Sequence, residues 1–116
     1  MRSRPKDLGT KMESRVVDAC QSAGLIAERL AEGGSKDLGD VRLYAEEEWV
    51  LEIKDQMALN VPRSLEKALG KSGTPDTALV YRKMMRKPGN SNRTQDGPII
   101  VALTLERFLE LLVEAS

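Results

Sequence analysis

The sequence predicts an α/β (α+β) fold in which helices flank a central mixed sheet. Apolar residues recur at helical spacing near both ends of the chain, and short runs between them are alternating or continuously apolar. Glycine and proline separate these segments. A chain of 116 residues suits one domain. We therefore expect a mobile basic tail over residues 1–8 and a single domain over residues 9–116.

The first half of the chain predicts a helix followed by three strands. A capping pattern begins at Thr10, and the apolar stripe of the following helix ends before Gly24. Residues 25–31 fit either a continuation of this helix or a first strand, and the preceding glycine favours the strand. Apolar and polar residues alternate over 41–45 and again over 49–55, which predicts the second and third strands.

The second half predicts a helix, two strands and a last helix. Pro62 suits the first turn of a short helix that ends at Gly70. Residues 77–81 and 98–103 have the apolar composition of core strands, and a polar loop separates them. Thr104 is placed to cap the C-terminal helix, whose apolar stripe we expect to dock on the sheet.

Composition limits the chemistry that is open to the chain. There is no histidine, which excludes Ser-His-Asp and Cys-His catalysis and histidine-ligated zinc. Cys20 is the only cysteine, so we expect a small core residue rather than a disulfide or a nucleophile. Lys plus Arg and Asp plus Glu both total 18, so any contact with nucleic acid requires local basic clusters.

Neither secretion nor membrane association is indicated. No apolar run approaches the roughly 18 residues that a membrane-spanning helix needs. The basic N-terminus is not followed by the apolar segment of a secretory signal. We expect a protein without a membrane partner that acts in the cytoplasm, or in the host cytoplasm if a phage encodes it.

The second and third expected strands carry charged residues that suit metal-dependent catalysis. A tight antiparallel hairpin would bring Asp40 beside Glu52 and Lys54, which share one face of their strand. Paired carboxylates suit a hard cation, so we expect Asp40, Glu52 and the backbone carbonyl of Ile53 to hold Mg²⁺, with Mn²⁺ able to substitute. The metal would activate a water for attack on a phosphodiester, and Lys54 would orient that water or stabilise the transition state.

These residues resemble the PD-(D/E)xK nuclease superfamily, and within it the small archaeal-type and phage Holliday junction resolvases. The resemblance implies a restriction-endonuclease-like core with the order αβββαβ. It implies Mg²⁺-dependent, structure-selective endonuclease activity that resolves four-way DNA junctions. It also implies that Glu13 joins Asp40, Glu52 and Lys54 as a catalytic and metal-binding residue. Gly39 departs from the superfamily's pattern, which has proline before the aspartate.

Each of these residues also fits a structural role. Glu13 lies three positions after Thr10 and fits a capping box. Asp40 follows a glycine, as turn residues often do. Glu52 and Lys54 fit a solvated strand face with weak charge pairing.

Two basic clusters are candidates for contact with the DNA backbone. One lies beside Glu13, and the other occupies the expected loop after residue 81, for which an ordinary solvated loop is the alternative. Ser35, which also fits a turn, and Gln56 resemble polar residues of the resolvases. The expected DNA contacts are Arg2, Arg4, Lys6, Lys11, Arg15, Ser35, Gln56, Arg82, Lys83, Arg86, Lys87 and Arg93.

The resemblance further implies a homodimer, because a four-way junction is cut at two symmetric positions. Leu105, Phe108 and Leu112, with Met84 and Met85, are candidates for an apolar interface, although packing on the chain's own sheet explains the helix stripe equally well. Two alternative functions stay open. One is a different PD-(D/E)xK endonuclease of restriction, repair or nicking type on branched or duplex DNA, and the other is a catalytically silent DNA-binding module.

Overall fold

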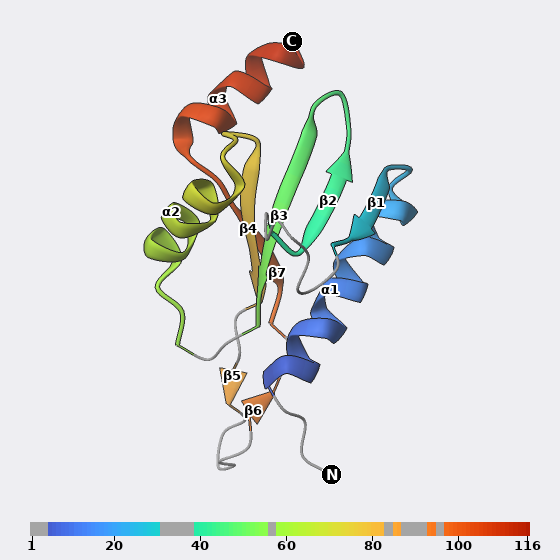
Figure 1. The fold of residues 1–116 in the computed structure, drawn as a ribbon, viewed down its shortest axis with the longest axis vertical. Helices are drawn as coiled ribbons and strands as arrows, with labels where there is room; N and C mark the ends of the chain where they lie inside the picture. The colour runs from blue at the N-terminus through green and yellow to red at the C-terminus, as the bar shows by residue number, and fades with distance from the viewer. Residues whose placement is uncertain (1–4, 31–38, 56–57, 83–84, 87–92, 95–96) are drawn as a thin grey trace.

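A five-stranded mixed sheet with helices on both faces forms the centre of the protein, as the sequence predicts (Figure 1). The computed structural model describes residues 5–30, 39–55, 58–82, 85–86, 93–94 and 97–116. None of the helices in these ranges is long and apolar enough to cross a membrane. The elements are α1 (Pro5–Ser22), β1 (Ile26–Arg29), β2 (Val41–Tyr44), β3 (Glu48–Lys54), α2 (Val61–Ser72), β4 (Thr77–Arg82), β5 (Met85–Arg86), β6 (Arg93–Thr94), β7 (Ile99–Ala102) and α3 (Leu105–Glu114).

The strands are arranged in the order β1-β2-β3-β4-β7. Neighbours pair antiparallel except β3 and β4, which are parallel. A parallel pair needs a crossover connection, and α2 supplies it. The β2–β3 pair is a tight hairpin in which Val41 lies opposite Leu51.

Alternation along the strands divides the sheet into two faces. On one face, Met12 and Val16 of α1 belong to the same buried cluster as Leu51, Ile53 and Val80. The even-numbered residues of β3 point the other way, towards α2. This confirms the predicted alternation in β3, and it places charged side chains on the α2 face of the sheet.

The first helix begins earlier than the sequence predicts. α1 starts at Pro5, so Thr10 lies inside the helix and the predicted capping pattern is wrong. Proline is well suited to a first helical position, because its φ angle is already helical and it lacks an N–H that would need a partner. Residues 5–8 therefore belong to α1 rather than to a tail, and residues 1–4 lie outside the described part of the chain. The helix ends before Gly24, which has a positive φ of 90°, as predicted.

The second helix has a well-defined cap at each end. The Asn60 side chain accepts a hydrogen bond from the Arg63 N–H at 3.1 Å, and Gly73 ends the helix in the left-handed conformation. The predicted stop at Gly70 is wrong, because α2 continues to Ser72.

The third helix docks through Arg107 and Leu111 rather than through the predicted apolar stripe. Thr104 caps α3 as expected, accepting a hydrogen bond from the Arg107 N–H at 3.2 Å. The Arg107 side chain is buried, donates to Asp76 at 2.6 Å and lies over the Trp49 ring, 5.4 Å from its centroid. These contacts turn the apolar stripe away from the sheet. Its exposed members are Leu105, Phe108, Leu109, Leu112 and Val113.

The segment between β4 and β7 is not entirely a loop. Met85–Arg86 and Arg93–Thr94 pair antiparallel as β5 and β6, with Arg86 opposite Arg93. The start of α1, the end of β3 and the β5–β6 pair lie towards one end of the molecule's long axis, and α3 lies at the other (Figure 1).

Candidate active site

The β2–β3 hairpin fixes the position of Asp40. Its backbone N–H donates to the Leu51 carbonyl at 3.0 Å, and its Oδ2 accepts the Ile53 N–H at 2.8 Å. Because Val41 pairs with Leu51, Asp40 lies opposite Glu52 in the continued register. The structure therefore holds the Asp40 carboxylate against the Glu52–Lys54 segment, as the hairpin argument predicts.

Gly39 makes this close approach of the two strands feasible. A Cβ atom at this buried position would lie 2.4 Å from Val50 Cγ1 and 3.4 Å from the Leu51 carbonyl oxygen. A proline would bring the same Cβ atom, so the glycine before Asp40 has a steric reason in this protein.

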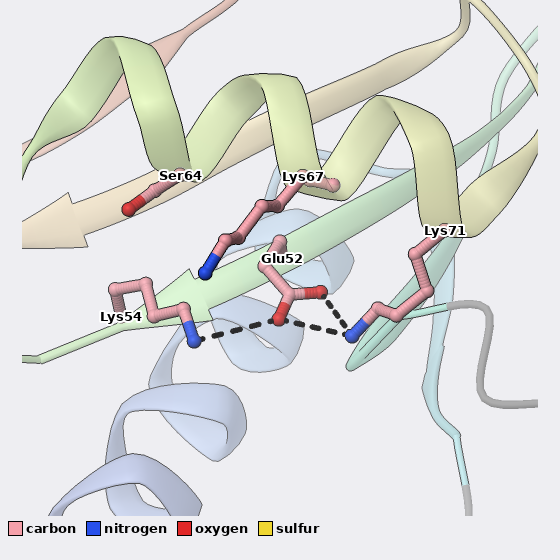
Figure 2. Close-up of a pocket in the computed structure, with 6 residues that line it drawn as sticks. Glu52, Lys54, Ser64, Lys67 and Lys71 are labelled. Carbon is pink, nitrogen blue, oxygen red and sulfur yellow. Dashed lines mark hydrogen bonds and ion pairs between the residues drawn. The ribbon is translucent and has the colours of Figure 1, made fainter.

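Glu52 is a buried carboxylate held between two lysines (Figure 2). It is only 7% exposed. Lys71 Nζ lies 3.2 Å from Oε1 and 3.0 Å from Oε2, and Lys54 Nζ lies 3.7 Å from Oε1. Lys71 donates its hydrogen bond to Oε1, whereas the geometry at Oε2 is unsuitable, so this buried oxygen accepts no hydrogen bond from the described residues. A solvated strand face is therefore the wrong description of Glu52.

Three lysines surround Glu52 in a cavity of about 360 Å³ between β3 and α2. Lys67 and Lys71 point from α2 towards β3, and Lys54 approaches from the strand (Figure 2). One carboxylate faces three ammonium groups, so the cavity carries net positive charge and suits an anion such as a phosphate. The α2 residues of this cavity are not among the site residues predicted from the sequence. Spacings of three and four residues, which place side chains on one helix face, are the signal for Ser64, Lys67 and Lys71.

Glu13 is not brought to this cavity. It lies on α1, which packs on the opposite face of the sheet from Glu52, and its Oε1 is 3.3 Å from Arg29 Nε. Its position inside α1 also rules out the predicted capping role. The spacing of acidic residues along the sequence does not reveal that α1, which carries Glu13, packs on the face of the sheet opposite to the Glu52 side chain.

Asp40 and Glu52 carry the donor atoms that a hard cation prefers. Within the described residues, no three carboxylates or other candidate ligands are grouped as a preformed metal site. The buried Glu52 Oε2 nevertheless has no hydrogen-bond donor, and Asp40 is fixed beside the Ile53 backbone. This pair of acids fits Mg²⁺ chemically, provided that the Glu52 carboxylate exchanges its contact with Lys71 for the metal.

The predicted DNA contacts have different environments. Arg82 is buried in β4 and pairs with Asp55 Oδ2 at 2.5 Å, so its assignment as a phosphate contact is wrong. Lys11 and Arg15 are exposed on α1. Lys6 lies in the first turns of α1, and Arg86 and Arg93 lie on β5 and β6. The remaining candidates lie outside the described residues, namely Arg2, Arg4, Ser35, Gln56, Lys83 and Lys87, together with Met84 of the expected interface.

Cys20 has the environment of a structural residue. It lies on α1, is partly buried and packs against the core cluster. Burial raises the pKa of its thiol, which lowers the fraction of reactive thiolate at neutral pH. The predicted core role is in keeping with this position.

Comparison with known proteins adds no assignment to this geometry. No protein-family model matches the chain, and no curated protein matches it.

The Asp55–Arg82 pair generates a stability prediction. Arg82→Met leaves a buried Asp55 carboxylate without its cation, so we expect the free energy of unfolding to fall by about 3–5 kcal/mol in urea denaturation. Arg15→Met, which removes an exposed cation from α1, is the matched control and is expected to change stability by no more than about 0.5 kcal/mol. Equal stability of Arg82→Met and wild type would contradict the buried role.

Proposed function

We propose that the protein is a Mg²⁺-dependent DNA endonuclease with Asp40, Glu52 and Lys54 in its active site. The observation that carries this proposal is the 2.8 Å hydrogen bond from the Ile53 N–H to Asp40 Oδ2, beside the buried Glu52. It brings the acid of one strand to the acid-x-lysine segment of the next. Burying a carboxylate among lysines carries a desolvation cost, and a role in a phosphodiesterase would account for keeping a charged residue at this position.

Asp40, Glu52 and the Ile53 carbonyl would hold the metal, and Mn²⁺ would substitute for Mg²⁺. When bound, the cation supplies an activated water and neutralises charge on the phosphate. Lys54 would donate to a phosphate oxygen or to the attacking water; its ammonium group reaches the same cavity as Glu52, which supports this role. Glu13 is left out of this ligand set because Arg29 holds its carboxylate and α1 lies on the other face.

Two further features support a nuclease. The chain order α1, β1, β2, β3, α2, β4 agrees with the αβββαβ order that the PD-(D/E)xK resemblance implies. The β5–β6 pair, which is basic in sequence, also lies towards the same end of the molecule as the end of β3 and the start of α1 (Figure 1). In this proposal it would follow a DNA backbone.

The substrate that we propose is a four-way DNA junction, and this choice rests on the resemblance to the resolvases. Another PD-(D/E)xK endonuclease would use the same residues on duplex or other branched DNA, whereas a silent DNA-binding module would bind without cutting. Action in the cytoplasm, or in a host's cytoplasm for a phage protein, belongs to the same proposal.

Cleavage of a labelled four-way junction beside a linear duplex of the same sequence tests this function. With Mg²⁺, we expect paired symmetric cuts in the junction alone. Asp40→Asn should lower the rate by roughly 100-fold or more, because a weakened metal site loses several kcal/mol of transition-state stabilisation. Asp18→Asn, an exposed change on α1, is the control and should cut normally.

Three results would change the proposal. Cutting of both substrates would leave a general endonuclease. Cutting that continues in EDTA would exclude the metal mechanism. Tight DNA binding without metal-dependent cutting would identify the silent DNA-binding module.

We also propose that the protein forms a homodimer through α3 and the neighbouring apolar surface. An apolar cavity of about 420 Å³ lies on the α1 face of the sheet, lined by side chains that include Cys20, Leu43, Val101 and Leu111. The exposed stripe of α3 is a second apolar surface, and in a two-fold dimer such surfaces of the two copies would be covered together. We propose a second copy as the occupant of this surface, because the resemblance to the resolvases implies a homodimer.

Sedimentation velocity at micromolar concentration tests the dimer. Wild type should sediment as a dimer, and Leu112→Glu should sediment as a monomer, because it places a charge in the middle of the exposed stripe. Glu106→Gln, an exposed polar change on α3, should leave the dimer intact. A wild-type monomer would contradict the assembly and would weaken the choice of a junction as substrate.

A further inference from the structure

The cavity beside Glu52 gathers positive charge from two elements. Lys67 and Lys71 lie four residues apart on α2, and Lys54 lines the same cavity from β3. Like charges at this helical spacing repel each other, so a negative group near them is favourable. Among the described residues that line the cavity, three ammonium groups face one carboxylate, which leaves two positive charges. On the α2 side of the cavity this balance favours an anion over a cation.

The donors for such an anion are directed into the space beside Glu52 (Figure 2). Among the described residues, Glu52 pairs with Lys71 and Lys54, at 3.0 Å and 3.7 Å. Lys67 is not part of this pairing and is exposed, so a ligand reaches it from solvent. Ser64, one helical turn earlier, adds a hydroxyl to the lining. An anion in this space therefore finds donors while the pair of Lys71 and Glu52 stays intact.

The remaining charge and the size of the cavity indicate which anion fits. A phosphodiester inside a nucleic-acid strand carries one negative charge, whereas a phosphate monoester carries about −1.5 to −2 near pH 7. The monoester therefore matches the two positive charges better. The cavity volume of about 360 Å³ falls within the roughly 300–1,000 Å³ of small-ligand sites. It has room for a phosphate group and for part of the sugar that carries it.

We propose that this cavity binds a phosphate monoester through Lys54, Ser64 and Lys67 without a metal ion. The phosphate at the end of a DNA strand and free inorganic phosphate share this chemistry. In the complex, Lys71 keeps its contact with Glu52 and contributes only its charge. The inference goes beyond the proposed nuclease, because it requires neither a divalent cation nor cleavage of DNA.

Binding of inorganic phosphate to isotope-labelled protein in EDTA is the first test. In NMR spectra at constant ionic strength, we expect the backbone amide signals of Ser64 and Lys67 to shift in a saturable way. Lys67→Gln should raise the dissociation constant about tenfold, because it removes a charged hydrogen-bond donor. Lys67→Arg keeps the charge and should retain most of the affinity. Dimethyl phosphate, a diester with one charge, should bind wild type about tenfold more weakly than inorganic phosphate.

Two further variants control for charge in general and for folding. Arg63→Gln removes an exposed cation from the same helix, outside the cavity, and should bind phosphate as wild type does. Ser64→Ala removes a neutral donor from the cavity and should raise the dissociation constant roughly threefold. Lys67 is exposed, so we expect its variants to fold, and thermal unfolding checks this before affinities are compared.

The second test distinguishes a DNA end from free phosphate as the source of the group. Fluorescence anisotropy in EDTA compares two short single strands of one sequence, each labelled at one end. The opposite end is a phosphate in one strand and a hydroxyl in the other. We expect wild type to bind the phosphorylated strand about tenfold more tightly, as for one added charged contact. Lys67→Gln should lose most of this preference, and Arg63→Gln should keep it.

The outcomes separate this inference from the proposed nuclease. Saturable phosphate binding that Lys67→Gln weakens supports the site; a preference for the phosphorylated strand then identifies a DNA end as the source, and equal binding of both strands identifies free phosphate. No saturable shift in wild type, equal affinity in Lys67→Gln, or equal affinity for dimethyl phosphate overturns the monoester site while metal-dependent cutting of the junction stands on its own. Phosphate binding by a protein that cuts no DNA overturns the nuclease alone.

Discussion

The register of the β2–β3 hairpin is the constraint on which the candidate site depends. It places Asp40 opposite Glu52 and lets the Asp40 carboxylate accept the Ile53 N–H. Gly39 is part of the same constraint, because a Cβ atom there would collide with Val50. A shift of one residue in this pairing would move Glu52 to the α1 face of the sheet and separate the two acids. The hairpin therefore sets both the packing of the core and the chemistry beside it.

The opposite faces of β3 explain how one strand serves both purposes. Leu51 and Ile53 bury their side chains against α1, while Glu52 and Lys54 face α2. Glu52 is almost as buried as its apolar neighbours, so its charge is balanced by lysines from two elements rather than by water. In the proposed nuclease, this carboxylate would exchange a lysine contact for the metal ion, whereas a well-packed apolar residue would suit stability better. This is the physical basis for the proposed nuclease.

Local patterns predict the parts of this arrangement that depend on neighbouring residues. The alternation in β3 and the short turn before it are sufficient to place Asp40 beside Glu52. Local sequence patterns do not predict the features that depend on contacts between residues far apart in the chain. The buried pairs Arg107 with Asp76 and Arg82 with Asp55 join residues far apart in the chain, and they decide how α3 docks and why Arg82 is unavailable to DNA. Glu13 lies far from Glu52 because α1 packs on the opposite face of the sheet, and Lys71 lies close to Glu52 because α2 crosses the other face. The spacing of residues within a single element determines neither of these two helix positions.

The most direct test of the account is a crystal structure with Mn²⁺, located by its anomalous scattering. We expect one strong peak bound by the carboxylates of Asp40 and Glu52, with the Lys71 ammonium group moved away from Glu52. A Mn²⁺ ion bound at another place, or none bound while Lys71 still pairs with Glu52, would contradict the claim that this hairpin builds a metal-dependent active site.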